Sequence, residues 1–457
     1  MSKRDRRSGA GDVTNPRVTR VFPRGATFHG GWLTAIGGVD VGDLVAAHGT
    51  PLYVLDASEL IGRMRAYRSA FPGWQVAYAS KALCVIGVLQ IAAAEQLHVD
   101  VSTAGELVTA DRAGVPASHI IFHGNNKSHA ELDLARRMGV GRIVVDSFTE
   151  LYRLADIAGR HDHVFDVLLR VTPGVDTSTH AFIRTGHDDS KFGFTLSTGL
   201  AADAVATAAK LDGVRLRGLH CHLGSQLTSA EVYGRAASIM TTFMAEVADA
   251  RGVRLDELNL GGGLGIAYTD EQPVALPAYA EALRTAVEAG RQRHGLPPLR
   301  LTVEPGRSIA GPAGVTIYRV GTVKRLETGP TYVSVDGGMS DNMRPALYGA
   351  VHTFAPAGRP RPGDSHDVAV VGKHCESGDF LGRDVALPAD IEDGDLVAAA
   401  STGAYTFSMA SNYNRLPRPA MVLAGDGAAR VVVRRETLDD VLARDEVLDL
   451  PTYTAQP

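Results

Sequence analysis

Cysteine is scarce in this sequence: its 457 residues include only Cys84, Cys221 and Cys375, which stand far apart. An odd number of distant cysteines excludes a disulfide framework, and no CxxC pair offers a zinc site. No run approaches the roughly 18 apolar residues of a transmembrane helix. The start, MSKRDRRSGAGDVTNPRVTR, is basic but lacks the apolar segment of a secretory signal. The sequence therefore predicts a cytoplasmic protein, not a membrane protein, whose residues 1–20 form a disordered basic tail.

An excess of basic residues is also lacking. The chain has 46 Lys and Arg against 51 Asp and Glu, which gives a formal net charge of −5. This balance argues against a nucleic-acid-binding protein. The chain is longer than the roughly 250 to 300 residues that one hydrophobic core organises, so two domains are expected.

What the sequence does contain, from about residue 50, is an alternation of short β-branched runs with helical patterns. Apolar residues at three- and four-residue spacing predict amphipathic helices, for example over 128–139 and 278–293. The eight candidate strands are WQVAYAS, HVDVST, HIIFHG, RIVVDS, DVLLRVTP, RLRGLHCHLG, ELNLGGG and RLTVEPG. Eight repeats predict that residues 49–310 form a closed (β/α)8 barrel. An open, doubly wound parallel sheet is the alternative.

Beyond residue 310 the pattern changes to strand-like pieces separated by glycine and proline. The segment GWLTAIGG, before residue 50, has the same character. We therefore expect a second, mostly β domain built from both chain ends, with residues 21–48 as its N-terminal strands and residues 311–457 as its C-terminal part.

The residues that can do chemistry follow the predicted strands, whose ends share one face of a barrel. Lys81 comes directly after QVAYAS. Burial there would lower the pKa of its amine and free it as a nucleophile toward an aldehyde. A lysine that merely extends its amine to solvent is the alternative.

Two histidines end another strand, in HCHLGSQ. His220 and His222 have a spacing of two and so point to the same side, whereas Cys221 faces the opposite way. A metal pair is conceivable, but no further ligand stands at a suitable spacing. An imidazole that lies flat against an aromatic cofactor is the other interpretation.

The next two strand ends carry NLGGGLGI and VEPGR. Backbone N–H groups of Gly261, Gly262 and Gly263 could surround a phosphate, although the loop is not the GxGxxG of dinucleotide sites. Glu304 and Arg307 flank a turn, where a plain salt bridge is the alternative. An aldehyde for Lys81, a ring for the histidine, a phosphate for the glycines and a ring nitrogen for Glu304 together describe pyridoxal 5′-phosphate.

At this point the sequence resembles a known family. The motifs AYASKA, HGNNK, SKFGF, HCHLGSQ, LGGGLGI, EPGR, DGGMSDNMRPALYG, CESGD and TGAY occur in the order found in fold-type III pyridoxal-phosphate decarboxylases. As a set they are similar to the diaminopimelate decarboxylase family, from about residue 30 to 450. The resemblance implies a barrel with a β domain from both chain ends.

The resemblance also implies roles for individual residues. Lys81 binds the cofactor aldehyde covalently, His222 stacks on the ring, and Glu304 partners the ring nitrogen. The remaining cofactor-binding residues are Ser225, Gly261, Gly262, Gly263, Gly306, Arg307 and Tyr405. The substrate-binding residues are Arg307, Arg344, Tyr348, Glu376 and Tyr405.

For Cys375 four interpretations are open from the residues alone: metal ligand, redox thiol, packed core residue or proton donor. Metal binding fails for want of further ligands, and redox chemistry for want of a partner thiol. The resemblance makes Cys375 a catalytic proton donor, together with Lys81 and His222 as catalytic residues. A buried, inert cysteine remains the alternative.

The resemblance implies decarboxylation of meso-2,6-diaminopimelate to L-lysine and CO2, the last step of lysine biosynthesis, in a homodimer with shared active sites. Arg307 and Arg344 would bind the distal carboxylate, and Glu376 the distal ammonium. Three rivals stay open: a related decarboxylase for ornithine, arginine, lysine or a specialised substrate, an amino-acid racemase, and a non-catalytic pyridoxal-phosphate carrier.

Overall fold

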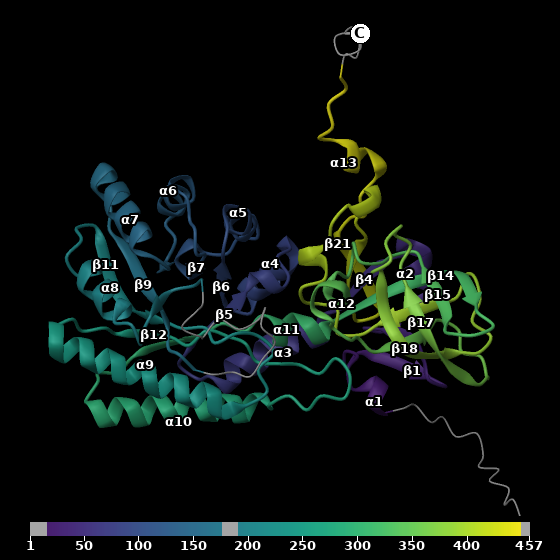
Figure 1. Ribbon diagram of the computed structural model, residues 1–457, viewed down its shortest axis with the longest axis horizontal. Coiled ribbons are helices and arrows are strands. Elements are labelled where there is room, and N and C mark those ends of the chain that lie inside the picture. Colours follow the sequence, from purple (N-terminus) through teal and green to yellow (C-terminus); the bar gives the residue numbers. More distant parts are fainter. Residues whose placement is uncertain (1–15, 176–190, 449–457) are drawn as a thin grey trace, which may run out of the picture.

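The computed structural model describes residues 16–175 and 191–448, which form two sheets with separate cores (Figure 1). Eight of the nine strands in the first sheet are parallel neighbours, and β8 also pairs with β9, which closes the ring. In chain order the ring consists of β5 (Gln75–Ala79), β6 (His98–Val101), β7 (Ile120–Phe122), β8 (Arg142–Val145), β9 (Phe165–Thr172), β11 (Val214–His220), β12 (Glu257–Asn259) and β13 (Arg300–Val303). Strand β10 (Phe194–Thr195) pairs with β9 outside the ring.

These strands coincide with the eight predicted ones, so the closed barrel is confirmed and the open sheet is excluded.

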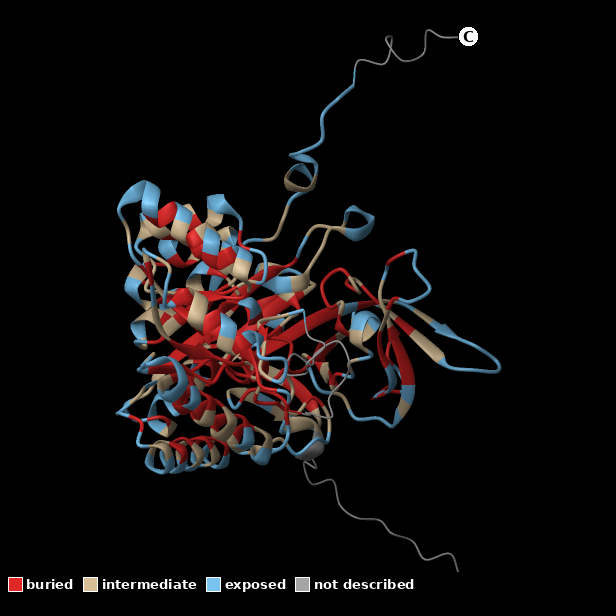
Figure 2. Cartoon of the chain, turned by 60° about the vertical axis from the view of Figure 1, so that its left-hand side comes forward, coloured by how far each residue is buried: buried red, intermediate tan, exposed pale blue. Residues whose placement is uncertain are grey.

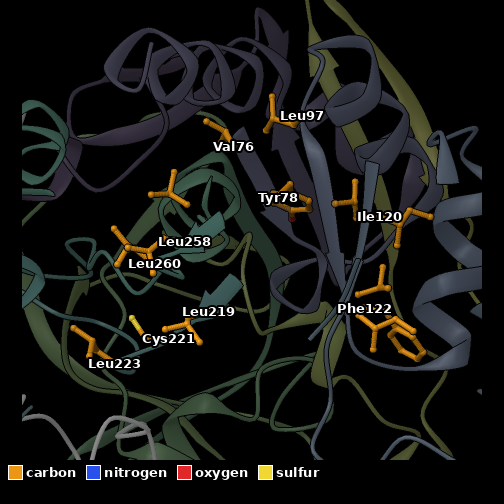
Figure 3. Close-up of a cluster of buried hydrophobic side chains, with 14 of the residues drawn as sticks. Val76, Tyr78, Leu97, Ile120, Phe122, Leu219, Cys221, Leu223, Leu258 and Leu260 are labelled. Atoms are coloured by element: carbon orange, nitrogen blue, oxygen red, sulfur yellow. The ribbon is translucent and has the colours of Figure 1, made fainter. Parts of the chain in front are cut away.

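Side chains alternate between the two faces of each barrel strand. In β5, Val76 and Tyr78 join the large core between the strands and the helices, whereas Ala77 belongs to a small separate cluster with Ile121 and other residues. Figure 3 shows part of the large core, in which the Cys221 side chain lies.

Helices cover the outside of the ring, and several of them begin at a residue whose side chain caps the helix. Ser128 and Glu131 form a reciprocal capping box at the start of α6, and Ser147 caps α7. The helices predicted over 128–139 and 278–293 are confirmed as α6 and α10. The helices of this domain are α3 (Ala57–Ala70), α4 (Ile86–Ala94), α5 (Ala104–Arg112), α6 (His129–Met138), α7 (Phe148–His161), α8 (Leu200–Ala208), α9 (Ala230–Arg251), α10 (Leu276–His294) and α11 (Arg307–Ala310).

The second sheet has twelve strands and is built from both ends of the chain. Strand β2 pairs with β16 through Leu33 and Ala357, which confirms the predicted mostly β domain of both chain ends. Its strands are β1 (Ala26–His29), β2 (Trp32–Ile36), β3 (Val39–Asp40), β4 (Leu52–Asp56), β14 (Gly314–Arg325), β15 (Thr331–Val335), β16 (Phe354–Ala357), β17 (Ser365–Val371), β18 (Phe380–Pro388), β19 (Leu396–Ala399), β20 (Ala420–Gly425) and β21 (Ala428–Val433). Its helices are α1 (Pro16–Thr19), α2 (Val41–His48), α12 (Arg344–Tyr348) and α13 (Leu438–Leu442).

Two details differ from the sequence prediction. The barrel was expected to begin at residue 49, but β4 pairs with β14 and β20 of the second sheet. All five β4 residues are buried, so their apolar pattern does not reveal which sheet they join.

The predicted disordered tail extends to residue 20, yet Pro16–Thr19 form α1, and the Arg20 guanidinium donates to the Thr269 carbonyl oxygen at 2.8 Å. Residues 1–15 of that tail lie outside the described residues.

Burial follows this architecture: the barrel strands and most strands of the second sheet are largely buried, and exposed residues lie on the outer helix faces, in loops and on outer strands such as β21 (Figure 2). Among the helices of the two described segments, none combines the length and apolar character needed to cross a bilayer.

Candidate active site at the carboxyl ends of the barrel strands

A cavity of about 870 Å³ lies at the carboxyl ends of the barrel strands and reaches the second domain. Most of the site residues predicted from the sequence line it, although they are spread over more than 300 positions of the chain. These are Lys81, His222, Ser225, Gly263, Glu304, Gly306, Arg307, Arg344, Tyr348 and Tyr405. The fold therefore brings the amine, the imidazole, the carboxylate and both guanidinium groups into one space.

Lys81 lies in a single 3-10 turn, Ser80–Ala82, directly after β5. Its side chain is exposed within the cavity rather than sealed from solvent. Desolvation by the surrounding protein would by itself lower the pKa of Lys81, but the carboxylate of Asp100 and the hydroxyl of Tyr405 outweigh this effect, and the pKa is raised. Desolvation therefore acts in the predicted direction, but the predicted net lowering of this pKa is wrong for the protein alone. The sequence did not reveal the acid on the neighbouring strand.

Glu304 is buried at the end of β13 and accepts three hydrogen bonds. His123 Nε2 and Asn259 Nδ2 lie 2.8 Å and 2.6 Å from its Oε1, and His220 Nε2 lies 3.2 Å from its Oε2. Burial would raise the pKa of Glu304, but the two histidines lower it well below its ordinary value. The carboxylate therefore stays ionised deep in the cavity, where it can hold a proton on a basic ring nitrogen.

The side chains of His220 and His222 have different partners, which does not fit a metal pair. His220 contacts Glu304, whereas His222 Nδ1 accepts a hydrogen bond of 3.2 Å from the Gly262 N–H group. The donor atoms of His123, His220 and Glu304 lie within 4.8 Å of one another, a spacing that a metal could also use. In this structure the Nε2 atoms of both histidines instead form hydrogen bonds with the Glu304 carboxylate. Burial lowers the pKa of His222 well below its ordinary value, so its ring is neutral, as suits stacking on a flat cofactor.

The glycine loop after β12 is packed too closely for any side chain. A Cβ at Gly261, Gly262 or Gly263 would lie 2.5, 2.0 or 2.3 Å from a backbone oxygen. Gly261 N–H donates to Asn259 Oδ1 at 2.9 Å, and Gly262 N–H donates to His222. Only Gly263 of the three lines the cavity, so Gly261 and Gly262 shape the loop and hold His222.

Two arginines form the wall on the side of the second domain. Arg307 donates to Ser225 Oγ through Nε at 3.1 Å and Nη2 at 3.0 Å, and its carbon Cζ lies 4.6 Å from the Tyr405 ring centre. Arg344 is buried, yet its Nε and Nη1 atoms have no hydrogen-bond partner among the described residues. Unpaired guanidinium nitrogens inside a cavity fit an anionic ligand group.

Cys375 and Glu376 do not line this cavity. They lie between β17 and β18 at the surface, where Cys375 is exposed and its backbone N–H donates to Asn414 Oδ1 at 3.1 Å. Glu376 Oε2 accepts from the Tyr413 hydroxyl at 3.4 Å. Exposure excludes the interpretation of Cys375 as a buried, inert core residue. One chain alone does not bring this pair to the other site residues.

Several cavity residues were missed by sequence reasoning. Asp100 and Arg170 end β6 and β9, so the rule that strand ends share one face could have found them. His123 stands in the quoted motif HGNNK but received no role. Tyr268 follows the glycine loop and has no sequence signal of its own, because its importance depends on contacts with residues distant in the chain.

The residues present fit pyridoxal 5′-phosphate. An amine for its aldehyde, an ionised carboxylate for its ring nitrogen, a neutral imidazole for its ring face and Ser225 with Gly263 for its phosphate all line one cavity. The chemistry of this donor set matches the four functional parts of that molecule.

Comparisons with known proteins agree with the site. The family model described as pyridoxal-dependent decarboxylase, pyridoxal binding domain, matches residues 57–311. The chain is 45% identical to diaminopimelate decarboxylase of Bacillus subtilis over 426 residues, which covers 92% of this chain and 95% of the relative. It is 44% identical to the Corynebacterium efficiens enzyme over 440 residues, which covers 95% and 96% of the two chains.

Solved structures give the same result. Diaminopimelate decarboxylase from Helicobacter pylori, complexed with L-lysine, superposes with a TM-score of 0.82 at 31% identity and covers 88% of this chain and 98% of that one. These matches extend well beyond the pyridoxal-binding domain and include the β domain. The chain belongs to the diaminopimelate decarboxylase family of pyridoxal-dependent decarboxylases.

Proposed function

We propose that this chain decarboxylates meso-2,6-diaminopimelate to L-lysine and CO2 with pyridoxal 5′-phosphate as its cofactor. The observation that carries the proposal is the cavity itself, which joins the cofactor-binding set to a wall of two arginines. Arg344 presents two buried nitrogens without hydrogen-bond partners among the described residues. A substrate with a second carboxylate satisfies them.

The bound cofactor would supply an aldehyde for the substrate amine and an electron-poor ring that stabilises a carbanion. Lys81 would hold it covalently, His222 would lie against its ring, and Glu304 would keep a proton on its ring nitrogen. Ser225, Gly263 and Gly306 would bind its phosphate, with Gly261 and Gly262 shaping the loop and Tyr405 and Arg307 beside it. Since Glu304 remains ionised through its histidine partners, it is prepared for this role before the cofactor binds.

The substrate's second amino-acid centre determines specificity in this proposal. Arg307 and Arg344 bind its carboxylate, while Tyr348 and Tyr405 line the same space. Ornithine and lysine as substrates lack a carboxylate at that end and would leave buried guanidinium groups unpaired, a loss on the order of several kcal/mol. The Helicobacter pylori relative is complexed with L-lysine. As the product of the proposed reaction, L-lysine retains the carboxylate of the centre that does not react.

Cys375 and Glu376 enter the proposal through a second chain. Because both lie on the surface outside their own cavity, we expect a homodimer in which each chain lends Cys375 as proton donor and Glu376 as ligand of the distal ammonium to its partner. A thiol that donates protons must stay reduced, which supports a cytoplasmic location.

Complementation tests the shared site. Mixing Lys81→Ala protein with Cys375→Ala protein should restore part of the activity, because a mixed dimer contains one intact site. Recovery of no activity from subunits shown to exchange would contradict the dimer proposal without affecting the substrate.

The substrate is tested by measuring CO2 release from meso-diaminopimelate, ornithine, arginine and lysine at equal concentrations. The proposal expects a clear preference for meso-diaminopimelate. Preference for another amino acid would favour a related decarboxylase, and racemisation without CO2 would favour a racemase. Glu304 speaks against the racemase, because such enzymes typically place an arginine at the ring nitrogen. A protein that binds the cofactor but transforms none of these compounds would be a carrier.

A further inference from the structure

Tyr268 is a buried residue that contacts both arginines of the cavity wall. The hydroxyl group of Tyr268 accepts a hydrogen bond of 2.5 Å from Arg307 Nη1. Its ring lies under the guanidinium group of Arg344, whose Cζ is 4.5 Å from the ring centre. The Cζ of Arg307 also lies 5.9 Å from this ring centre, so the Tyr268 side chain meets Arg307 through its hydroxyl group and both cations through its aromatic ring.

The two guanidinium groups need such a mediator because they repel each other. Burial lowers the pKa of Arg344, Tyr268 opposes this shift, and the charge of Arg307 adds to it. Apart from Tyr268, Arg307 is held by Ser225, whereas Arg344 has two nitrogens without partners among the described residues. The orientation of Arg344 thus depends strongly on the ring beneath it.

Tyr268 is itself fixed from several directions. Its backbone oxygen accepts hydrogen bonds from the N–H group of Thr353 at 3.2 Å and from Thr353 Oγ1 at 2.8 Å. Its backbone N–H donates to Glu271 Oε2 at 3.0 Å, and the edge of its ring meets His352 at a centroid distance of 5.1 Å. Thr353 and His352 follow α12, the helix that begins with Arg344, so the loop is tied to the segment that carries the second arginine.

Resting on the proposed function, we propose that Tyr268 is the positioning residue that sets the spacing of Arg307 and Arg344 and thereby selects substrates with a distal carboxylate. Its hydroxyl and ring hold Arg307 and its ring holds Arg344, so that both guanidinium groups converge on one anion. The contribution is specific to the carboxylate and does not extend to the amine that reacts.

Two ligands that differ only in that carboxylate provide the test. L-lysine keeps the distal carboxylate of the substrate, and cadaverine is L-lysine without it. Binding of each to the holoenzyme is measured by calorimetric titration for the unsubstituted protein, Tyr268→Phe and Tyr268→Leu. Tyr268→Phe should weaken L-lysine binding roughly tenfold through the lost bond to a charged group. Tyr268→Leu should weaken it roughly fiftyfold, since it also removes the ring beneath Arg344. Cadaverine affinity should change less than about twofold in both variants.

Tyr233→Phe is the matched control, because it removes a buried hydroxyl that has no hydrogen-bond partner among the described residues. It should leave both affinities unchanged. In steady-state assays, Tyr268→Phe should raise KM for meso-diaminopimelate while kcat changes little. Cofactor absorbance and a melting curve verify that each variant is folded and loaded.

Equal losses for L-lysine and cadaverine, or no loss for either, would overturn the role of Tyr268. Failure of the unsubstituted protein to release CO2 from meso-diaminopimelate would instead overturn the proposed function. Ligand binding by the Tyr268 variants thus tests the role of Tyr268, and CO2 release by the unsubstituted protein tests the proposed function.

Discussion

At the scale of single residues, Glu304 shows how a buried acid keeps its charge. Two imidazole groups and the Asn259 amide surround its oxygens, and the two imidazole groups outweigh the effect of burial and lower its pKa. Hydrogen bonds to the charged form of a carboxyl group favour that form. The site thus contains a fixed anion whose protonation state does not change near neutral pH.

Replacing Glu304 by glutamine removes this anion and keeps nearly the same shape. We expect kcat to fall on the order of 100-fold, because a preorganised charge at the reacting centre is lost. Cofactor binding, followed by absorbance titration, should weaken much less than kcat falls. An unchanged kcat in cofactor-saturated Glu304→Gln protein would contradict the role given to this carboxylate.

Asp341 is a buried acid of the opposite kind. It accepts hydrogen bonds from the Tyr318 hydroxyl at 2.6 Å and from the Gly338 N–H group at 2.7 Å, yet burial raises its pKa from 3.8 to about 7. Because the folded state holds this proton more tightly than the unfolded state, its contribution to stability is present below pH 4 and is lost as the pH rises to about 7.

The variant Asp341→Asn should therefore gain stability relative to the unsubstituted protein by roughly 2 to 3 kcal/mol between pH 5 and pH 8. Asparagine can accept from the Gly338 N–H group through Oδ1 and donate from Nδ2 to the Tyr318 hydroxyl oxygen, and it has no proton to lose. Urea unfolding of both proteins at the two pH values measures this difference. A difference that stays constant or decreases with rising pH would be inconsistent with a raised pKa.

At the scale of elements, the glycine loop connects the fold to the site. A methyl group at Gly262 would lie 2.0 Å from the Glu304 backbone oxygen. Gly262→Ala should therefore displace β12 from β13 and raise the dissociation constant for pyridoxal phosphate at least about tenfold. Fluorescence titration with the cofactor measures this change. Gly159→Ala in α7 is the control, because nothing lies within 4 Å of its added methyl group. If Gly262→Ala bound the cofactor as tightly as this control and the unsubstituted protein, close packing at Gly262 would not be needed for the site.

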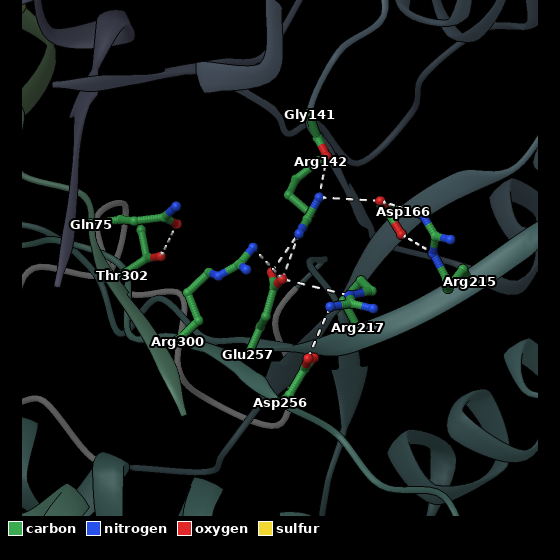
Figure 4. A network of polar contacts seen from close by, with 10 residues as sticks. All are labelled: Gln75, Gly141, Arg142, Asp166, Arg215, Arg217, Asp256, Glu257, Arg300 and Thr302. Carbon is green, nitrogen blue, oxygen red and sulfur yellow. Dashed lines mark hydrogen bonds and ion pairs between the residues drawn. The ribbon is translucent and has the colours of Figure 1, made fainter. Parts of the chain in front are cut away.

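At the amino ends of the barrel strands, opposite the cavity, ion pairs connect neighbouring strands. Glu257 at the start of β12 binds Arg142 at 2.5 Å and Arg300 at 3.1 Å, with Arg217 at 3.6 Å (Figure 4). Breaking a largely buried pair is destabilising, so Glu257→Ala should lower the free energy of unfolding by about 2 kcal/mol. KM should not change, because this network lies at the amino ends of the strands.

The matched control for that change is Asp256→Asn, which breaks the more exposed pair with Arg217 at 2.9 Å. It should alter the free energy of unfolding by less than about 0.5 kcal/mol. Chemical denaturation and steady-state kinetics are measured on the same preparations. Equal losses of stability in the two variants would argue against a special role of Glu257 in the barrel.

Elements were more predictable from the sequence than their partners. The eight barrel strands and helices α6 and α10 follow from hydrophobic periodicity, which reports burial along one segment. Residues 52–56 were expected within the barrel domain but form β4 of the second sheet, because a segment buried on both faces has the same apolar pattern in either sheet. The charge interaction of Asp100 with Lys81 and the contacts of Tyr268 with two arginines were not predicted, for a related reason. They depend on which strand ends and loops meet in space, and the residue pattern within one segment does not show which other segments it will contact.

At the scale of the whole molecule, the chain has the parts of a complete site divided between two places. The cavity holds the residues proposed to bind the cofactor and the distal carboxylate, and the exposed loop between β17 and β18 holds Cys375 and Glu376. In the homodimer proposed above, the cavity of one chain would meet the loop of its partner, which would unite the two parts.

The proposed function requires that Lys81 bind the cofactor through its amine. Borohydride treatment of the protein loaded with pyridoxal phosphate, followed by digestion and mass spectrometry, shows which residue carries the cofactor. We predict a single stable cofactor label on Lys81 and its loss in Lys81→Ala. A label on another lysine, or no label in protein that still releases CO2, would contradict the account.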